Sequence, residues 1–176
     1  LLEHFSDRIQ RGERVLIAGD ATVTVALFKV IAGLWPWGGG SVTIPREHER
    51  TMAFLPQRPF LPVGSLDALL CYPQSPQTYE PRAIHHALEC VGVAWLVPRL
   101  REIDNWERLL PLRTQQRLGF ARLILQRPEW ILIEEATDAL DASAERCLME
   151  MLHRELPNAA IITISFHSGL EPLHQR

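Results

Sequence analysis

Short apolar runs alternate with segments of helical periodicity along this chain. Residues 14–19 (RVLIAG), 129–135 (EWILIEE) and 158–167 (NAAIITISFH) have the composition of buried strands, and each ends in glycine or in polar residues. Rough alternation of apolar and polar positions predicts a half-buried strand within residues 1–10. One further strand is expected at 51–55, and another at 41–44, after a glycine-rich turn.

Apolar residues recur at helical spacing in several segments between these strands. Residues 25–34 show this spacing and end at Gly33, a residue type that favours a helix C-terminus. Residues 143–156 predict another helix, and residues 81–100 are mostly helical in pattern. The strongest amphipathic pattern predicts a helix over Gln115–Gln126 with these apolar side chains buried: Leu118, Ala121, Leu123 and Leu125.

Strands that alternate with helices indicate an α/β fold with a mainly parallel sheet. The mostly helical stretch from about residue 65 to about residue 126 interrupts this alternation. We therefore expect one domain in two parts. Residues of about 1–64 and 127–176 form the core, and residues of about 65–126 form an inserted helical subdomain.

Composition narrows the class of protein. The chain has 176 residues, 47% of them hydrophobic, which suits one soluble domain with a sizeable core. A net charge of -3 gives no electrostatic case for binding nucleic acid or an anionic membrane surface. Three widely spaced cysteines lack the Cys/His spacing of zinc sites, so we expect no zinc site. We expect no membrane span, and we interpret the chain as a soluble piece of a longer polypeptide.

Three stretches carry a resemblance to a known family. They are AGLWPWGGGSVTIP, FLPQRPFLPVGSL and DNWERLLPLRTQQRLGFARLILQRPEWILIEEATDALD, at residues 32–45, 54–66 and 104–141. In this order they resemble the nucleotide-binding domain of ABC transporters. The branch indicated is the half-transporters that include peroxisomal fatty-acyl carriers and bacterial peptide or vitamin B12 exporters. The resemblance implies a P-loop NTPase (RecA-like) core, a helical subdomain, and MgATP as the cofactor.

The phosphate-binding loop departs from the family pattern. A Walker A motif, GxxxxGK[ST], uses glycines, a helix N-terminus and a lysine to hold phosphate, and a hydroxyl to hold Mg²⁺. The matching positions here are Gly19, Asp20, Ala21, Thr22, Val23 and Thr24. They contain no second glycine and no lysine, and the segment is one residue short. The chain's only lysine, Lys29, lies beyond the first turn of the predicted helix.

The acidic end of the next apolar strand follows the family more closely. The resemblance implies that Glu134 is the Mg²⁺ carboxylate and Glu135 the general base for the attacking water. It also implies that Gln57 contacts Mg²⁺ and that His167 contacts the γ-phosphate. Without the resemblance, Glu134 and Glu135 are equally a pair of solvated acids at a strand end.

The signature loop, spelled LSGGQ or similar in the family, is also changed. Its positions are Leu110, Pro111, Leu112, Arg113 and Thr114. Proline removes a hydroxyl and a backbone N–H, and arginine replaces a glycine that lets the backbone approach phosphate. Pro111 equally suits a helix start, and the Arg113 charge is an alternative phosphate contact.

Two functional hypotheses remain open from the sequence. One is a transport ATPase that couples ATP binding and hydrolysis to transport across a membrane. The other is a non-hydrolysing domain that dimerises or docks. Both imply a transmembrane domain of an ABC transporter, expected in the same polypeptide, and a second nucleotide-binding domain as a homodimer or heterodimer partner. Both imply a position at the cytoplasmic face of a membrane.

Overall fold

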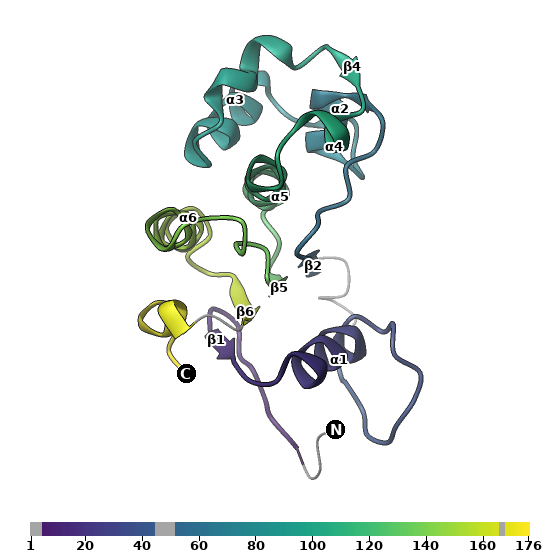
Figure 1. The fold of residues 1–176 in the computed structure, drawn as a ribbon, viewed down its shortest axis with the longest axis vertical. Coiled ribbons are helices and arrows are strands. Elements are labelled where there is room, and N and C mark those ends of the chain that lie inside the picture. The colour runs from purple at the N-terminus through teal and green to yellow at the C-terminus, as the bar shows by residue number, and fades with distance from the viewer. Residues whose placement is uncertain (1–4, 45–51, 166–167) are drawn as a thin grey trace. The chain divides into compact units, whose positions relative to one another are not determined.

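The structure is a computed structural model that describes residues 5–44, 52–165 and 168–176. The chain divides into two compact units. The sheet unit consists of Leu1–Pro56, Pro128–Glu135 and Pro157–Arg176, and the helical unit consists of Gln57–Arg127 and Ala136–Leu156. Figure 1 shows the course of the chain through both units.

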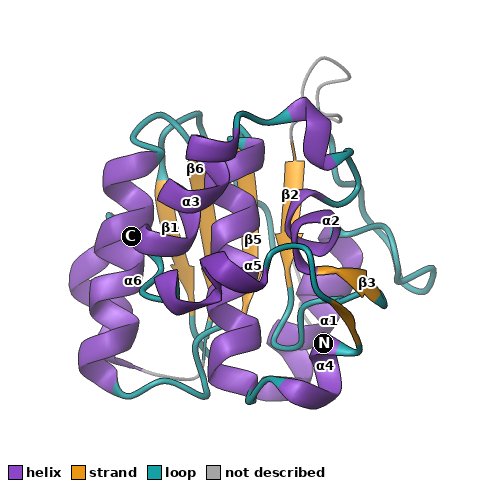
Figure 2. Ribbon diagram, turned by 90° about the horizontal axis from the view of Figure 1, so that it is seen from above, coloured by secondary structure: helices purple, strands orange, loops and turns teal. Residues whose placement is uncertain are grey.

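Four parallel strands form the sheet of the sheet unit. They are β1 (Arg14–Ile17), β2 (Met52–Leu55), β5 (Trp130–Glu134) and β6 (Ala160–Ile164). Their order is β1-β6-β5-β2, and every pair is parallel (Figure 2). The predicted α/β fold with a mainly parallel sheet is confirmed, and β5 and β6 occupy its centre.

The central strands supply the core of the sheet unit because they are buried on both faces. Ile131, Leu132 and Ile133 of β5 are at most 1% exposed. Helix α1 (Ala21–Ile31) covers the sheet through Phe28, which packs in one cluster with Leu132 and with two isoleucines of β6. This packing explains why both strands are apolar at consecutive positions.

Helix α1 ends just before Gly33, as predicted from the sequence. Gly33 has a φ of 73°, in the left-handed region that glycine adopts without strain. The N–H of Gly33 donates to the Val30 carbonyl at 3.1 Å, and the N–H of Leu34 donates to the Lys29 carbonyl at 2.7 Å. These two bonds form a Schellman motif and satisfy carbonyls that the helix leaves unpaired.

The helical unit contains five α-helices among its described residues: α2 (Leu66–Cys71), α3 (Pro81–Cys90), α4 (Trp106–Leu109), α5 (Leu112–Gln126) and α6 (Ala142–Glu155). It also contains the 3₁₀ turns Pro76–Thr78 and Ala94–Arg99, and an antiparallel pair of short strands, β3 (Gly64–Ser65) and β4 (Ile103–Asp104). A third 3₁₀ turn, Ser168–Leu173, lies in the sheet unit.

Helix α5 is the centre of the helical unit and contacts α2, α3 and α6. The predicted helix over Gln115–Gln126 is confirmed, although it begins earlier, at Leu112. The four side chains expected to be buried are 0–8% exposed: Leu118, Ala121, Leu123 and Leu125. Phe120 and Gln116 are also fully buried, because the helix is enclosed on more than one side.

Two predicted strands are wrong in the described residues. Residues 5–10 form no strand and are mostly exposed, and Asp7 instead bonds the Arg176 guanidinium at 2.9 Å. Residues 41–44 also form no strand and are largely exposed. Local patterns predicted both strands, alternation for the first and a preceding glycine-rich turn for the second, but a strand forms only where a neighbouring strand accepts its backbone hydrogen bonds.

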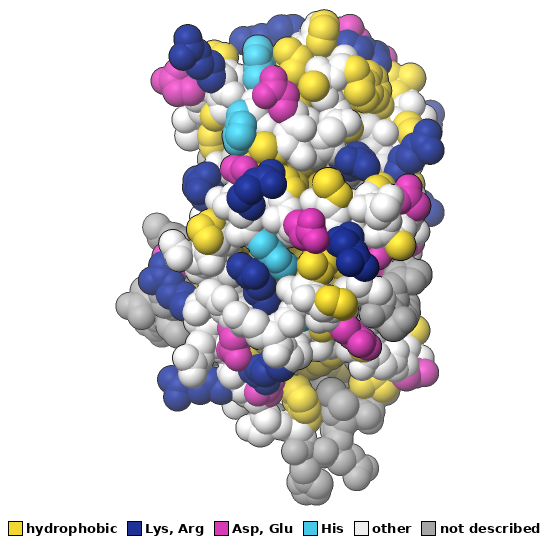
Figure 3. Space-filling model, turned by 90° about the vertical axis from the view of Figure 1, so that its left-hand side faces the viewer, with side chains coloured by type: hydrophobic (Ala, Val, Ile, Leu, Met, Phe, Trp, Pro, Cys, Tyr) yellow, Lys and Arg dark blue, Asp and Glu magenta, His cyan; other side chains and the backbone are white. Residues whose placement is uncertain are grey.

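Charge on the surface is mixed in sign. On the face in Figure 3, basic and acidic side chains are interspersed rather than gathered by sign.

The helices of the described residues are all too short or too polar to cross a bilayer.

Candidate nucleotide site

The start of α1 is held by its own acidic side chain. Asp20 is the N-cap residue, and its Oδ1 accepts hydrogen bonds from the N–H groups of Thr22 at 2.8 Å and Val23 at 3.4 Å. The Asp20 carbonyl accepts from the N–H groups of Val23 and Thr24. The first donors of the helix are therefore satisfied by Asp20, and its negative charge lies at the positive end of the helix dipole.

Thr24 and Lys29 make contacts with other parts of the sheet unit. The Thr24 hydroxyl donates to the carbonyls of Asp20 and Ala21 at 3.1 and 3.3 Å, and Thr24 is 2% exposed. The Lys29 ammonium lies 5.9 Å from the centre of the Trp35 ring, at the other end of α1. The loop thus presents neither an exposed hydroxyl at Thr24 nor a lysine at the helix start.

A pocket of about 360 Å³ lies beside this loop within the sheet unit. Its lining is mainly apolar and includes Phe5, Val15 and Leu27. The one basic side chain among its lining residues is Arg176, which pairs with Asp7 and Glu13. The pocket therefore offers a phosphate no basic side chain among its lining residues other than this paired arginine.

Glu134 and Glu135 lie at the carboxyl end of the central strand β5, as predicted. Strands β1 and β5 are parallel to β6 between them, so the loop from Gly19 leaves the same edge of the sheet as the two acids. Glu135 has a φ of 45° and donates its backbone N–H to the Ile164 carbonyl at 3.0 Å, while its side chain is 7% exposed.

The neighbouring charges act on the Glu134 carboxyl. Burial raises the pKa of the Glu134 carboxyl, the Lys29 charge lowers it, and the Glu135 charge raises it. The charge of Lys29 thus acts on Glu134. A divalent cation at this edge of the sheet would favour the charged form of Glu134, but the roles given to both acids stay predictions.

A hydrogen-bonded network in the helical unit holds Gln57. Its Nε2 donates to Asp138 at 2.5 Å, and its carbonyl accepts from Gln116 Nε2 at 3.0 Å. Gln116 also donates to Asp138 and accepts from the N–H of Ala139 at 3.2 Å. The roles of Asp138 and Gln116 were not predicted from the sequence, although both residues lie in the quoted motifs. The pairing of Gln57 with Asp138 spans 81 residues, and such a contact leaves no local pattern.

The loop at residues 110–114 is a hydrogen-bonded helix start. Pro111 is the N-cap residue of α5, and its carbonyl accepts from the N–H groups of Thr114 and Gln115 at 2.8 and 3.1 Å. The Gln115 side chain donates to the carbonyls of Glu107 and Leu110, so it fixes the preceding turn. Leu110 and Thr114 are buried, Leu112 is half-buried, and Pro111 and Arg113 are exposed.

The predicted site residues fall in both units. The phosphate loop, Glu134 and Glu135 belong to the sheet unit, whereas Gln57 and residues 110–114 belong to the helical unit. His167 lies outside the described residues. In the sheet unit Glu134 and Glu135 lie together at the end of β5. In the helical unit Gln57 lies in one hydrogen-bonded network with Gln116 and Asp138.

A parallel sheet with a glycine loop feeding a helix, and with acids at the carboxyl end of a central strand, is an α/β arrangement that P-loop NTPase domains share with other nucleotide-binding folds. The solved structure of a bacterial Atm1-family ABC exporter with ATP bound matches this fold, with a TM-score of 0.77 and 17% identity. The match covers 90% of this chain and 30% of that chain.

Similar sequences give the family. An ABC transporter ATP-binding protein of Haemophilus influenzae is 33% identical over 100% of this chain and 29% of its own length. The lysosomal cobalamin transporter ABCD4 of Homo sapiens is 31% identical over 99% of this chain and 30% of its own length. No protein-family model matches. The chain is a homologue of ABC transporter ATP-binding proteins, so the predicted resemblance is confirmed, and it spans less than a third of the length of these relatives.

Asp20→Ala is expected to destabilise the protein by about 1 kcal/mol, because the N–H groups of Thr22 and Val23 lose their side-chain acceptor. The matched variant Asp20→Asn keeps an acceptor oxygen and is expected to cost less. Urea denaturation followed by circular dichroism measures both. An equal loss in the two variants would show that the charge, rather than the cap, stabilises the helix start.

Proposed function

We propose that this chain is the nucleotide-binding domain of an ABC transporter whose own phosphate loop holds MgATP weakly or not at all. The observation that carries this proposal is the Asp20 cap, which occupies the N–H groups of Thr22 and Val23 at the start of α1. A phosphate at this helix start would have to displace a bonded carboxylate and would meet its like charge.

The expected loss of affinity is large. A hydrogen bond to a charged group contributes about 1.5–3 kcal/mol net, so losing a lysine and one N–H contact removes roughly 3–6 kcal/mol. At about 1.4 kcal/mol per tenfold change, phosphate binding weakens by about two to four decades relative to an intact loop. Millimolar ATP would then leave such a site largely empty.

The loop at residues 110–114 supports the same proposal. Pro111 supplies neither a hydroxyl nor an N–H, and the Gln115 side chain holds the turn before it in place. In the family this loop binds the γ-phosphate in the partner domain's site. This domain therefore offers a changed contact to a partner as well as to its own nucleotide.

A transport ATPase is the second candidate function. Glu135 at the carboxyl end of β5 favours it, because a general base for water belongs at this edge of the sheet. Gln57 favours it too, since the network with Gln116 and Asp138 holds the loop that the family uses to contact Mg²⁺. Under this candidate Glu134 would hold the ion.

Both candidates share the same setting. The proposed partners are an ABC transmembrane domain and a second nucleotide-binding domain, and the proposed place is the cytoplasmic face of a membrane. We favour the non-hydrolysing domain, which dimerises or docks without turnover.

Isothermal titration of the purified protein with MgATP, and with ATP plus chelator, tests the proposal. We expect no saturation at millimolar nucleotide and no dependence on Mg²⁺. Asp20→Gly, which frees the helix donors, is expected to bind ATP more tightly than the wild type. Asp20→Asn, which keeps them capped, is not expected to match Asp20→Gly. A Mg²⁺-dependent Kd in the micromolar range for the wild type would overturn the proposal, and no gain in Asp20→Gly would show that the cap is not the obstacle.

A further inference from the structure

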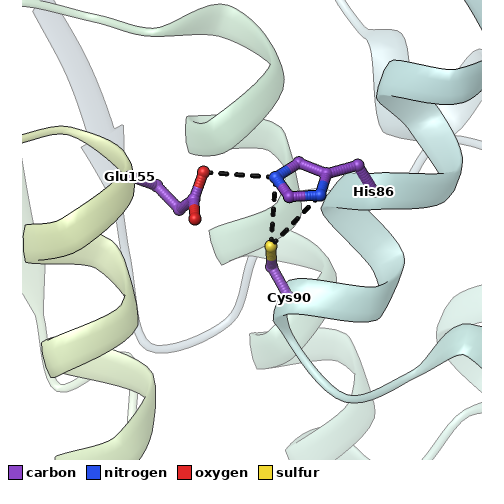
Figure 4. Close-up of side chains that lie close together, drawn as sticks. All are labelled: His86, Cys90 and Glu155. Carbon is purple, nitrogen blue, oxygen red and sulfur yellow. Dashed lines mark hydrogen bonds and ion pairs between the residues drawn. The ribbon is translucent and has the colours of Figure 1, made fainter.

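Three side chains with metal-binding atoms converge within the helical unit. His86 and Cys90 project from α3, and Glu155, the last residue of α6, points toward them (Figure 4). Their ligand atoms all lie within 4.8 Å of one another. The spacing of four residues places His86 and Cys90 on the same face of the helix, one turn apart.

Two of the distances among these atoms are close to those around a shared metal ion. His86 Nε2 lies 3.2 Å from Glu155 Oε2 and 3.4 Å from Cys90 Sγ. Around a tetrahedral zinc ion with ligand bonds of about 2.0 Å to nitrogen and oxygen and 2.3 Å to sulfur, these separations would be about 3.3 and 3.5 Å. Cys90 Sγ also lies 3.8 Å from His86 Nδ1, so the sulfur contacts both ring nitrogens (Figure 4). An ion bound at Nε2 therefore requires the His86 or Cys90 side chain to rotate, while the Glu155 contact needs little change.

The surroundings orient the third ligand and leave the ion a path from solvent. Arg127 donates to the Glu155 carbonyl at 2.9 Å, and Arg154 lies 3.7 Å from Glu155 Oε1, which leaves Oε2 facing His86. The His86 side chain is 55% exposed, so an ion can enter from solvent and water can complete its coordination. The site has three protein ligands and one open position.

We propose that His86, Cys90 and Glu155 form a zinc-binding site that ties α3 to the end of α6. Imidazole, thiolate and carboxylate together suit a borderline-soft divalent ion, whereas Mg²⁺ and Ca²⁺ prefer oxygen alone. The ion bonds the cysteine as thiolate and releases its proton to solvent. The proposal departs from the sequence-based expectation of no zinc site, because that expectation did not consider the His86/Cys90 pair or a third ligand distant along the chain.

Cobalt substitution tests the site directly. One equivalent of Co²⁺ added to the reduced, purified protein is expected to give a thiolate-to-cobalt charge-transfer band, and one equivalent of Zn²⁺ is expected to abolish it. Competition of Zn²⁺ with a chromophoric chelator then gives the affinity. Because each variant removes a ligand, His86→Asn and Cys90→Ser are each expected to weaken zinc binding by more than about 100-fold.

Two matched controls separate this site from casual binding. His85 neighbours His86 on α3, and Cys147 is an exposed free cysteine outside the cluster, so His85→Asn and Cys147→Ser are expected to leave binding unchanged. Zinc is also expected to raise the melting temperature of the wild type but not of Cys90→Ser. A cobalt band that persists in Cys90→Ser, or is lost in Cys147→Ser, would overturn the proposal, as would the absence of any band. None of these outcomes depends on whether the chain binds ATP.

Discussion

Trp106→Ala is expected to destabilise the protein by about 3–5 kcal/mol, the usual cost of removing a large buried aromatic side chain. Trp106 is fully buried, its Nε1 donates to the Gly64 carbonyl at 3.0 Å, and the Arg99 guanidinium lies 4.8 Å from the centre of its ring. The substitution leaves a cavity at α4 and removes the donor to that carbonyl. A loss of this size is a large part of the total stability of a typical domain, about 5–15 kcal/mol.

Trp95→Ala is the matched control, since Trp95 is 55% exposed and lies in the same unit. We expect it to change the free energy of unfolding by less than about 1 kcal/mol. Trp106→Phe keeps most of the volume and gives an intermediate value should the alanine variant not fold. Urea denaturation compares all three, and equal losses at Trp95 and Trp106 would contradict the packing described here.

Much of the sheet could be predicted from the sequence because its strands are buried on both faces. A continuous apolar run is typical of a strand buried on both faces of a sheet, and the run in β5 is Ile131, Leu132 and Ile133. Helix α5 was predictable for a related reason, since its apolar positions recur at helical spacing. In both cases the pattern in the sequence reflects the burial of apolar side chains, which is the main driving force of folding.

Residues 5–10 show where this reasoning fails. Their alternation is the pattern of a half-buried strand, yet Asp7 binds Arg176, a residue 169 positions away. A strand needs a partner, and a local pattern contains no information about whether one is present. The same holds for residues 41–44.

For the candidate site, the sequence shows which residue types are present but not how they are bonded. The missing lysine and glycine were visible in the sequence, whereas the bonds from Thr22 and Val23 to Asp20 required coordinates. The link from Gln57 to Asp138 and the cluster of His86, Cys90 and Glu155 both join residues that are far apart in the chain. Such contacts follow from tertiary packing, which single-sequence patterns do not encode.

The wild-type protein is expected to hydrolyse MgATP at or near the background rate. Asp20 caps the start of helix α1 at its own phosphate loop. Pro111 and Arg113 change the loop that would contact a partner domain's nucleotide. In a homodimer both composite sites would carry both changes. In a heterodimer each site would carry one of them, so pairing with an intact domain repairs neither site fully. Lost contacts to the transition state reduce the rate further, beyond the loss of binding.

Phosphate release at millimolar MgATP, compared between the wild type and Glu135→Gln, tests the central claim that this nucleotide site does not turn over. Glu135→Gln is the matched variant because it keeps the size of the side chain and removes the only group proposed as general base. We predict the same background rate for both proteins. A clear turnover in the wild type that disappears in Glu135→Gln would contradict the account, because the site would then work without its lysine.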